Sequence, residues 1–144
     1  MLKIRAEQFD AFKDVAEAAF VRRVAGHLRH KHGDALVQLP NQVCTVKQLP
    51  EDILIDMVRK GIARARGYDV IWESTLTAFV AIMFVAAPNF DEHPLIQRVL
   101  KDDAIPPESR IDQLWDRTTD QNWEAVAQNY DVDAWQREPK EKSE

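Results

Sequence analysis

The longest apolar run in the sequence is AFVAIMFVAA, from Ala78 to Ala87. This run is about half as long as a helix must be to span a membrane, so it predicts a buried helix in a globular domain. The helical pattern covers residues 71–87, begins amphipathic and becomes apolar on all sides. A helix that is apolar on all sides belongs in the centre of a domain, where other elements cover it.

Helical periodicity also dominates the rest of the chain. Apolar residues recur at three- and four-residue steps in residues 6–32, from Phe9 and Phe12 to Leu28, which predicts an amphipathic helix. A second helix is expected to begin at Pro50 or Glu51 and to end at Gly67, with Asp69 capping the third. The remaining expected helices cover residues 94–102, 105–119 and 123–130.

Residues 33–50 are the least regular part of the sequence. Pro40 and Pro50 bracket the β-branched stretch VCTV, which has no evident partner strand, so we expect irregular structure with a short helical turn. The fold class predicted is therefore all-α, a single-domain bundle of five or six helices around the helix at 71–87. The domain is expected to cover residues 1–136, followed by a polar tail, residues 137–144, that does not pack.

Composition and charge narrow the class of protein. With 144 residues, of which 45% are hydrophobic, the chain is long enough for one domain with a core of its own. Cys44 is the single cysteine and the N-terminus has no signal-peptide pattern, which together predict a cytoplasmic protein. Residues 1–90 carry 12 Lys and Arg against 10 Asp and Glu, whereas residues 91–144 carry 7 against 14. The acidic segment is either a solvated surface or a face for a basic partner.

The apolar run ends in APNFDEHP, which has the acids and histidine of a catalytic or metal site. A structural turn between two helices explains the same residues. Pro88 ends a helix, Asp91 is a preferred N-cap for the next, and Phe90 packs the turn onto the core. We therefore predict a structural turn made of Pro88, Asn89, Phe90 and Asp91.

Metal binding is an alternative raised by the sequence HLRHKH. His27 and His30 lie three residues apart and share a helix face, with His32 nearby. A zinc site needs further ligands, and His93 and Cys44 stand at no recognisable spacing. No Walker loop, G-x-G-x-x-G or H-E-x-x-H motif occurs. We expect no catalytic residues, no bound metal and no cofactor.

Nucleic-acid binding is a second alternative. Arg59, Lys60, Arg64 and Arg66 in VRKGIARAR add positive charge to the basic end of the first helix. Two basic helices can form a phosphate-binding face. Basic residues opposite an apolar stripe are also what an ordinary surface helix shows, and the interleaved aromatic residues of single-strand binders are missing.

Aromatic residues in the acidic C-terminal segment are the candidate partner-binding residues. Trp115, Trp123, Tyr130 and Trp135 have little apolar sequence around them. They either close the core or form a contact surface, and Trp and Tyr are enriched at binding hot spots.

Four stretches resemble a known family: IRAEQFDAF…FVRRVAGHLR, VRKGIARARGYDV, FVAIMFVAAPNFDEHPLIQRVL and IPPESRIDQLW. The order of these features over roughly residues 4–116 is similar to small helical bacterial proteins that are encoded beside type VI secretion cargo genes, near spike proteins, toxins and adaptor proteins. The GPxFD-like turn is the most specific part, and this chain has Ala87 where glycine is common. The resemblance implies a role near effector loading or effector neutralisation.

These observations together predict a non-enzymatic, cytoplasmic protein-binding module. Its partner is expected to be a secreted effector or its carrier, and its role that of an adaptor or an immunity protein. The metal site at His27 and His30, as a sensor or a metal-dependent enzyme, and the nucleic-acid face remain as alternatives.

Overall fold

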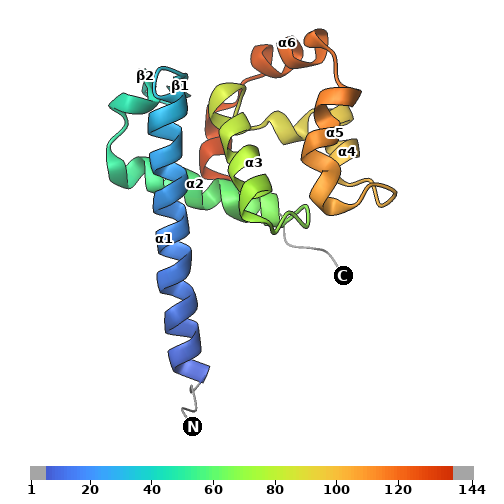
Figure 1. Cartoon of the computed structure of the whole chain (residues 1–144). Coiled ribbons are helices and arrows are strands. Elements are labelled where there is room, and N and C mark those ends of the chain that lie inside the picture. Colours follow the sequence, from blue (N-terminus) through green and yellow to red (C-terminus); the bar gives the residue numbers. More distant parts are fainter. Residues whose placement is uncertain (1–5, 138–144) are drawn as a thin grey trace.

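The structure is a computed structural model that describes residues 6–137, with side chains described from residue 11. Over this range six α-helices and one two-stranded hairpin are joined by short 3₁₀ helices (Figure 1). In chain order the elements are α1 (Ala6–His32), β1 (Leu36–Leu39), β2 (Gln42–Thr45), η1 (Val46–Gln48), α2 (Glu51–Arg66), α3 (Glu73–Val85), η2 (Phe90–Glu92), α4 (Pro94–Leu100), η3 (Pro107–Ser109), α5 (Arg110–Arg117), α6 (Asp120–Gln128) and η4 (Val132–Gln136).

Helix α3 contains most of the long apolar run and contacts α1, α2, α5 and β1. It begins two residues later and ends two residues earlier than the predicted 71–87. Its closest neighbour is α2, because Gly61 has no side chain and a Cβ there would lie 2.9 Å from the Met83 sulfur. Coverage of α3 is incomplete, since Val85 is exposed. The buried residues of α3 are Leu76, Phe79, Val80, Ile82, Met83 and Phe84.

The all-α prediction is wrong at residues 33–50. Strands β1 and β2 pair antiparallel, with Leu36 opposite Thr45 and Leu39 opposite Gln42, so that residues 40 and 41 form the turn. The expected helical turn is present as η1, directly after β2. Val37 of β1 and Val46 of η1 are fully buried and attach this segment to the core, while Leu36 and Val43 face solvent. The chain is therefore mostly helical with one small sheet.

Helix α1 is longer than the body that it packs against. Figure 1 shows α2 crossing behind the upper half of α1, while the N-terminal half of α1 extends beyond the other elements. Phe20, Val24 and Leu28 are buried as the amphipathic pattern predicts. Phe12 and Val15 belong to the same apolar pattern, yet their exposed fractions are 72% and 67%. The apolar pattern therefore predicted the helix correctly, but of its described apolar side chains those at Phe12 and Val15 are not covered.

The link between α2 and α3 also differs from the prediction. Gly67 follows α2 as expected, but its φ of −62° is right-handed, and the left-handed residue is Asp69, with φ 65°. Asp69 therefore does not cap α3, whose N-cap position is held by Trp72. The two-residue offset leaves Ile71 exposed before the helix begins.

One continuous group of buried apolar residues includes side chains from α1 to η4. The predicted tail, residues 137–144, lies outside the described residues except for Arg137. Arg137 is partly buried and pairs with Glu92 and Asp131. Among the helices described between residues 6 and 137, none is long and apolar enough to cross a membrane.

Candidate interaction surfaces

The turn predicted at residues 88–91 is present, but Asp91 has a different role. Asp91 lies in η2, and the N-cap of α4 is His93, whose Nδ1 accepts a hydrogen bond from the Leu95 backbone N–H at 3.2 Å. The Asp91 carboxylate is buried and accepts a hydrogen bond from the Arg64 guanidinium of α2. A long-range ion pair therefore replaces the local helix cap that the sequence suggested.

Other polar groups complete the environment of this ion pair. Arg64 Nη1 donates to the Pro88 carbonyl oxygen at 2.6 Å, and the Tyr68 hydroxyl donates to Asp91 Oδ2 at 2.9 Å. Burial raises the pKa of Tyr68 well above its ordinary value, and the negative charge of Asp91 raises it further. No described side-chain polar atom that is buried lacks a hydrogen-bond partner. The cluster is thus a satisfied structural network that fixes the turn to α2.

Asn89 extends this network to the C-terminal segment. Its Nδ2 donates to the Asn129 carbonyl oxygen at 2.9 Å, and its Oδ1 accepts from the Asp131 backbone N–H at 3.0 Å. Both contacts hold the link between α6 and η4. The turn therefore positions the segment that carries the candidate partner-binding aromatics.

Two of the four candidate aromatics belong to the interior. Trp135 is 1% exposed and packs on Phe84, with ring centroids 4.8 Å apart. Trp135 Nε1 donates to the Gln38 carbonyl oxygen, and the Tyr130 hydroxyl accepts from the Gln38 N–H, both at 3.0 Å. These side chains satisfy the outer edge of β1, which would otherwise offer free backbone groups. Trp135 closes the core, and Tyr130, half-buried with a pKa raised by burial, seals the hairpin edge.

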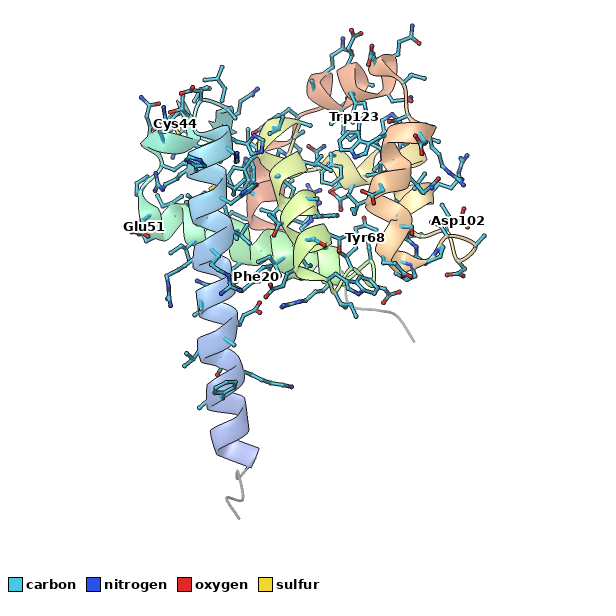
Figure 2. The ribbon with its side chains drawn as sticks, in the orientation of Figure 1. Phe20, Cys44, Glu51, Tyr68, Asp102 and Trp123 are labelled. Atoms are coloured by element: carbon cyan, nitrogen blue, oxygen red, sulfur yellow. The ribbon has the colours of Figure 1, made fainter. Side chains whose placement is uncertain are left out.

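Trp115 and Trp123 form an exposed aromatic pair where α5 meets α6. Their rings stack with centroids 5.5 Å apart and an interplanar angle of 27°. Trp123 is half-buried, donates from Nε1 to Thr118 Oγ1 at 2.9 Å, and lies on the inner side of α6 (Figure 2). It also stacks on buried Phe90 at 6.3 Å. Trp115 remains 56% exposed, so a large rigid ring is presented to solvent on an ordered base.

Exposed carboxylates surround this pair along the chain. Asp112 and Asp116 lie on α5, and Asp120 and Glu124 lie on α6. Arg117 is the exposed cation of these two helices. We call Trp115, Trp123 and these four acidic residues the acidic aromatic face. A protonated Lys or Arg placed over a tryptophan ring is attracted by the ring quadrupole, and neighbouring carboxylates add to that attraction.

A groove between α1 and α3 is a second candidate surface, which the sequence did not predict. Its volume is about 510 Å³, and it is lined from α1 by Phe20, Arg23, Val24 and His27. From α3 it is lined by Ala78 and Ala81 among others. Arg23 pairs with Glu73 of α3 at 3.1 Å, with both side chains well exposed. Phe20 is labelled in Figure 2, at the point where α1 passes α3.

The candidate metal ligands do not converge. Among the side chains that the structure describes, residues 11–137, no group of three or more His, Cys, Asp or Glu is placed to hold a metal ion. His27 and His30 are exposed on α1, Cys44 lies in β2 of the hairpin, and His93 caps α4. Figure 2 shows Cys44 at the end of the molecule where the hairpin lies.

Each of the four basic residues proposed to bind nucleic acid lies in an ion pair with an acidic residue of the same chain. Arg64 is buried in its ion pair with Asp91, so it presents no charge to solvent. Arg66 forms two hydrogen bonds with Glu17, at 2.7 and 2.9 Å, and these lower the pKa of Glu17. Arg59 and Lys60 both approach Asp56, at 3.9 and 3.1 Å. The four residues do not form a free basic face.

The structural role of Arg64 was not predicted, although the sequence contains a signal for it. Arg64 follows Met57 by seven residues and Gly61 by three, so it falls on the apolar stripe of α2. An arginine on a buried stripe requires an acidic partner.

Comparison of the chain with family models, with characterised proteins and with solved structures finds no match.

Proposed function

We propose that this chain is a non-enzymatic, cytoplasmic protein-binding module that acts on a type VI secretion effector or its carrier. The acidic aromatic face is the proposed contact surface. The observation that carries the proposal is Trp115, which is 56% exposed and stacked on a half-buried Trp123. The association with secretion cargo rests on the resemblance of the sequence.

The ordering of Trp115 supports a binding role. Because its ring already lies against Trp123, little side-chain freedom is lost when a partner covers its other face. Tryptophan is also among the residues that most often dominate binding energy at interfaces. An aromatic row continues inward, since Trp123 stacks on Phe90 and Phe90 contacts Phe79 at 4.9 Å. The contact residue is thus supported by the core.

The charges around Trp115 indicate which partner surface fits. Asp112, Asp116, Asp120 and Glu124 repel phosphates and acidic proteins. A partner segment rich in Lys and Arg is attracted, with one cation over the Trp115 ring. Steering by exposed charges is screened by salt, so association should slow as ionic strength rises.

Co-purification with the products of neighbouring genes tests the proposal. We expect an effector or its carrier to be retained at micromolar concentration. Trp115→Ala should weaken binding by about 30-fold or more, the effect of losing a hot-spot residue. Trp72→Ala is the matched control, since Trp72 is a partly exposed tryptophan at the start of α3 and should leave binding unchanged. Failure to retain any partner, or equal effects of the two substitutions, would overturn the proposal.

Toxicity assays separate the two roles within this proposal. The adjacent effector gene is expressed with and without this chain in cells that lack other immunity genes. Rescue of growth indicates an immunity protein, whereas lost secretion without rescue indicates an adaptor. Trp115→Ala should abolish whichever effect is seen, because both depend on the same contact.

A further inference from the structure

We infer that the partner residue that binds over Trp115 is an arginine, and that Asp112 is the carboxylate that selects arginine over lysine. The inference rests on the proposed function, because it takes the acidic aromatic face as the contact surface. It goes further by giving one carboxylate a role and the partner a defined side chain. Three features carry it: a repeated sequence unit, carboxylates without counter-ions beside an exposed ring, and the shape of the guanidinium group.

A short sequence unit occurs twice in the acidic aromatic face. Residues 112–116 read DQLWD and residues 120–124 read DQNWE, so aspartate, glutamine, tryptophan and a final acid recur in the same order. The first copy lies in α5 and the second in α6. In each copy the aspartate precedes the tryptophan by three residues, which places both side chains on the same side of their helix. The unit therefore sets one carboxylate beside each indole ring.

The two copies of this unit have different surroundings. Trp123 is half-buried, and its ring stacks on both Trp115 and Phe90. Trp115 remains 56% exposed, so the α6 copy supports the ring that a partner residue can reach on the α5 copy. Because a long helical side chain leans toward the N-terminus of its helix, the Trp115 ring is expected over the turn that contains Asp112. Asp112 is thus the carboxylate closest to the accessible ring.

The carboxylates of the acidic aromatic face have no counter-ion within the described part of the chain, since none of the four forms an ion pair there. Arg117, the exposed cation of these helices, lies two residues after Trp115 and therefore points to another side of α5. Its guanidinium approaches Asp102 at 3.9 Å and Gln113 Oε1 at 3.3 Å. Asp112 is exposed, so its oxygens are available to accept hydrogen bonds from a partner.

A guanidinium group can use the ring and the carboxylate at the same time. It is planar, it stacks flat on aromatic faces, and its N–H donors point outward in its own plane. When it stacks on Trp115, these donors are directed toward a carboxylate beside the ring, which is the position that the spacing gives to Asp112. A lysine ammonium is a compact, strongly hydrated charge without a fixed plane, so the ring and the carboxylate compete for it. Arginine is therefore the side chain that this arrangement fits.

Other classes of partner residue fit this site less well. An apolar or aromatic side chain would cover the Trp115 ring and remove water from Asp112 without supplying a hydrogen bond, which costs free energy. An acidic or phosphorylated residue would be repelled by the carboxylates. A cation is thus required, and the planar shape of its head group decides between the two basic residues.

Peptide titration of the native chain at low ionic strength tests the choice of residue. The peptides share one Gly-Ser sequence and carry arginine, lysine or citrulline at the same positions, while NMR follows the indole N–H signal of Trp115. We expect the arginine peptide to bind at least about fivefold more tightly than the lysine peptide. Citrulline has the shape of arginine without its charge, so its peptide should leave the signal in place. The Trp72 signal is the control within the same molecule, because Trp72 lies at the start of α3 outside the repeated unit.

Asp112→Asn tests the selecting carboxylate. The substitution removes the charge and keeps the size of the side chain, so the arginine peptide should lose its advantage and bind like the lysine peptide. Glu51→Gln is the matched control, because it removes one charge from an exposed side chain at the start of α2, at the opposite end of the molecule from α5 (Figures 1 and 2). Far-UV circular dichroism should show the native fold for both variants.

The outcomes separate this inference from the proposed function. Equal binding of the arginine and lysine peptides, or an equal loss in Asp112→Asn and Glu51→Gln, overturns the selection of arginine and leaves a contact based on net charge. A Trp115 signal that no peptide shifts also overturns the inference, even where co-purification retains a partner. Co-purification that retains no partner, with the arginine preference present, contradicts the proposed function and leaves the arginine site in place.

Discussion

Arg64 and Asp91 form a buried ion pair that connects α2 to the turn after α3 across 27 residues of sequence. The guanidinium also donates to the Pro88 carbonyl oxygen at 2.6 Å, so the Arg64 side chain binds both the Asp91 carboxylate and the backbone of this turn. Arg64 Nη1 also donates to the Ala134 carbonyl oxygen of η4 at 3.5 Å, and Asn89 of the same turn binds the α6–η4 link, so the C-terminal segment is held both directly and through the turn. The ion pair thus fixes the turn whose Asn89 holds the chain directly after α6.

Asp91→Ala is expected to lower the free energy of unfolding by about 3–5 kcal/mol, measured by urea denaturation. The substitution leaves the Arg64 guanidinium buried without its counter-ion, which is the costly half of a broken ion pair. Asp56→Ala is the control, because the ion pair of Asp56 with Lys60 lies at the surface of α2 and should contribute below about 1 kcal/mol. A loss below about 1 kcal/mol for Asp91→Ala would contradict the structural role.

The double substitution Arg64→Met with Asp91→Ala gives a second test of the same pair. In Asp91→Ala the Arg64 guanidinium is buried without a counter-ion. The double variant has no such unpaired charge, so it should be more stable than Asp91→Ala alone. Additive losses in the double-mutant cycle would mean that Arg64 and Asp91 do not interact.

Trp135→Ala and Trp115→Ala should separate a core tryptophan from a surface one. Trp135 is 1% exposed, so its truncation leaves a large cavity and should cost about 3–5 kcal/mol. Trp115→Ala should change the free energy of unfolding by about 1 kcal/mol or less, because its ring is mostly exposed. Urea denaturation followed by far-UV circular dichroism measures both. Similar losses for the two variants would place Trp115 in the core and remove it as a contact residue.

Asn89→Ala should loosen the link between α6 and η4. The variant loses a hydrogen bond to the Asn129 carbonyl oxygen and one from the Asp131 N–H, together worth about 1–2 kcal/mol. Hydrogen exchange should show the Asp131 amide losing about tenfold or more of its protection. Gln128→Ala, an exposed position on α6, is the control and should leave that amide unchanged. Unchanged protection in Asn89→Ala would mean that other contacts hold the segment.

Helices α1, α2 and α4 were predictable because their buried residues repeat at three- and four-residue steps. Residues 33–50 were not, since the strands contain four residues each and the turn Pro40–Asn41 lacks the glycine that usually signals a tight hairpin. The edge of β1 is completed by Tyr130 and Trp135, more than ninety residues away. A local pattern contains no information about such a contact.

The candidate surfaces show the same division between local and long-range information. Residue type identified Trp115 as a contact residue, but the sequence did not distinguish it from Trp135, because exposure depends on where α6 and η4 pack. The local sequence predicted Asp91 as a helix cap. In the structure Asp91 instead pairs with Arg64, whose charge attracts the carboxylate more strongly than the helix N-terminus does. The amphipathic pattern of α1 correctly gave a helix. It did not show that the body ends near Phe20 and leaves Phe12 uncovered.

Tyr68→Phe is expected to flatten the fall in stability at alkaline pH. Burial raises the pKa of Tyr68 above the ordinary value of about 10, and the Asp91 charge adds to the increase. Above about pH 10 the Tyr68 hydroxyl loses its proton in the unfolded chain and keeps it in the folded chain. The contribution of Tyr68 to the free energy of unfolding is therefore complete below pH 10 and is lost as pH rises further.

At pH 8 the Tyr68→Phe variant should be about 1–3 kcal/mol less stable than the native chain, because the hydrogen bond to Asp91 Oδ2 is missing. Urea denaturation from pH 8 to 11 should show the gap between the two proteins narrowing above pH 10. The raised pKa of Tyr130 affects both proteins equally, so parallel curves would mean that Tyr68 does not keep its proton when folded.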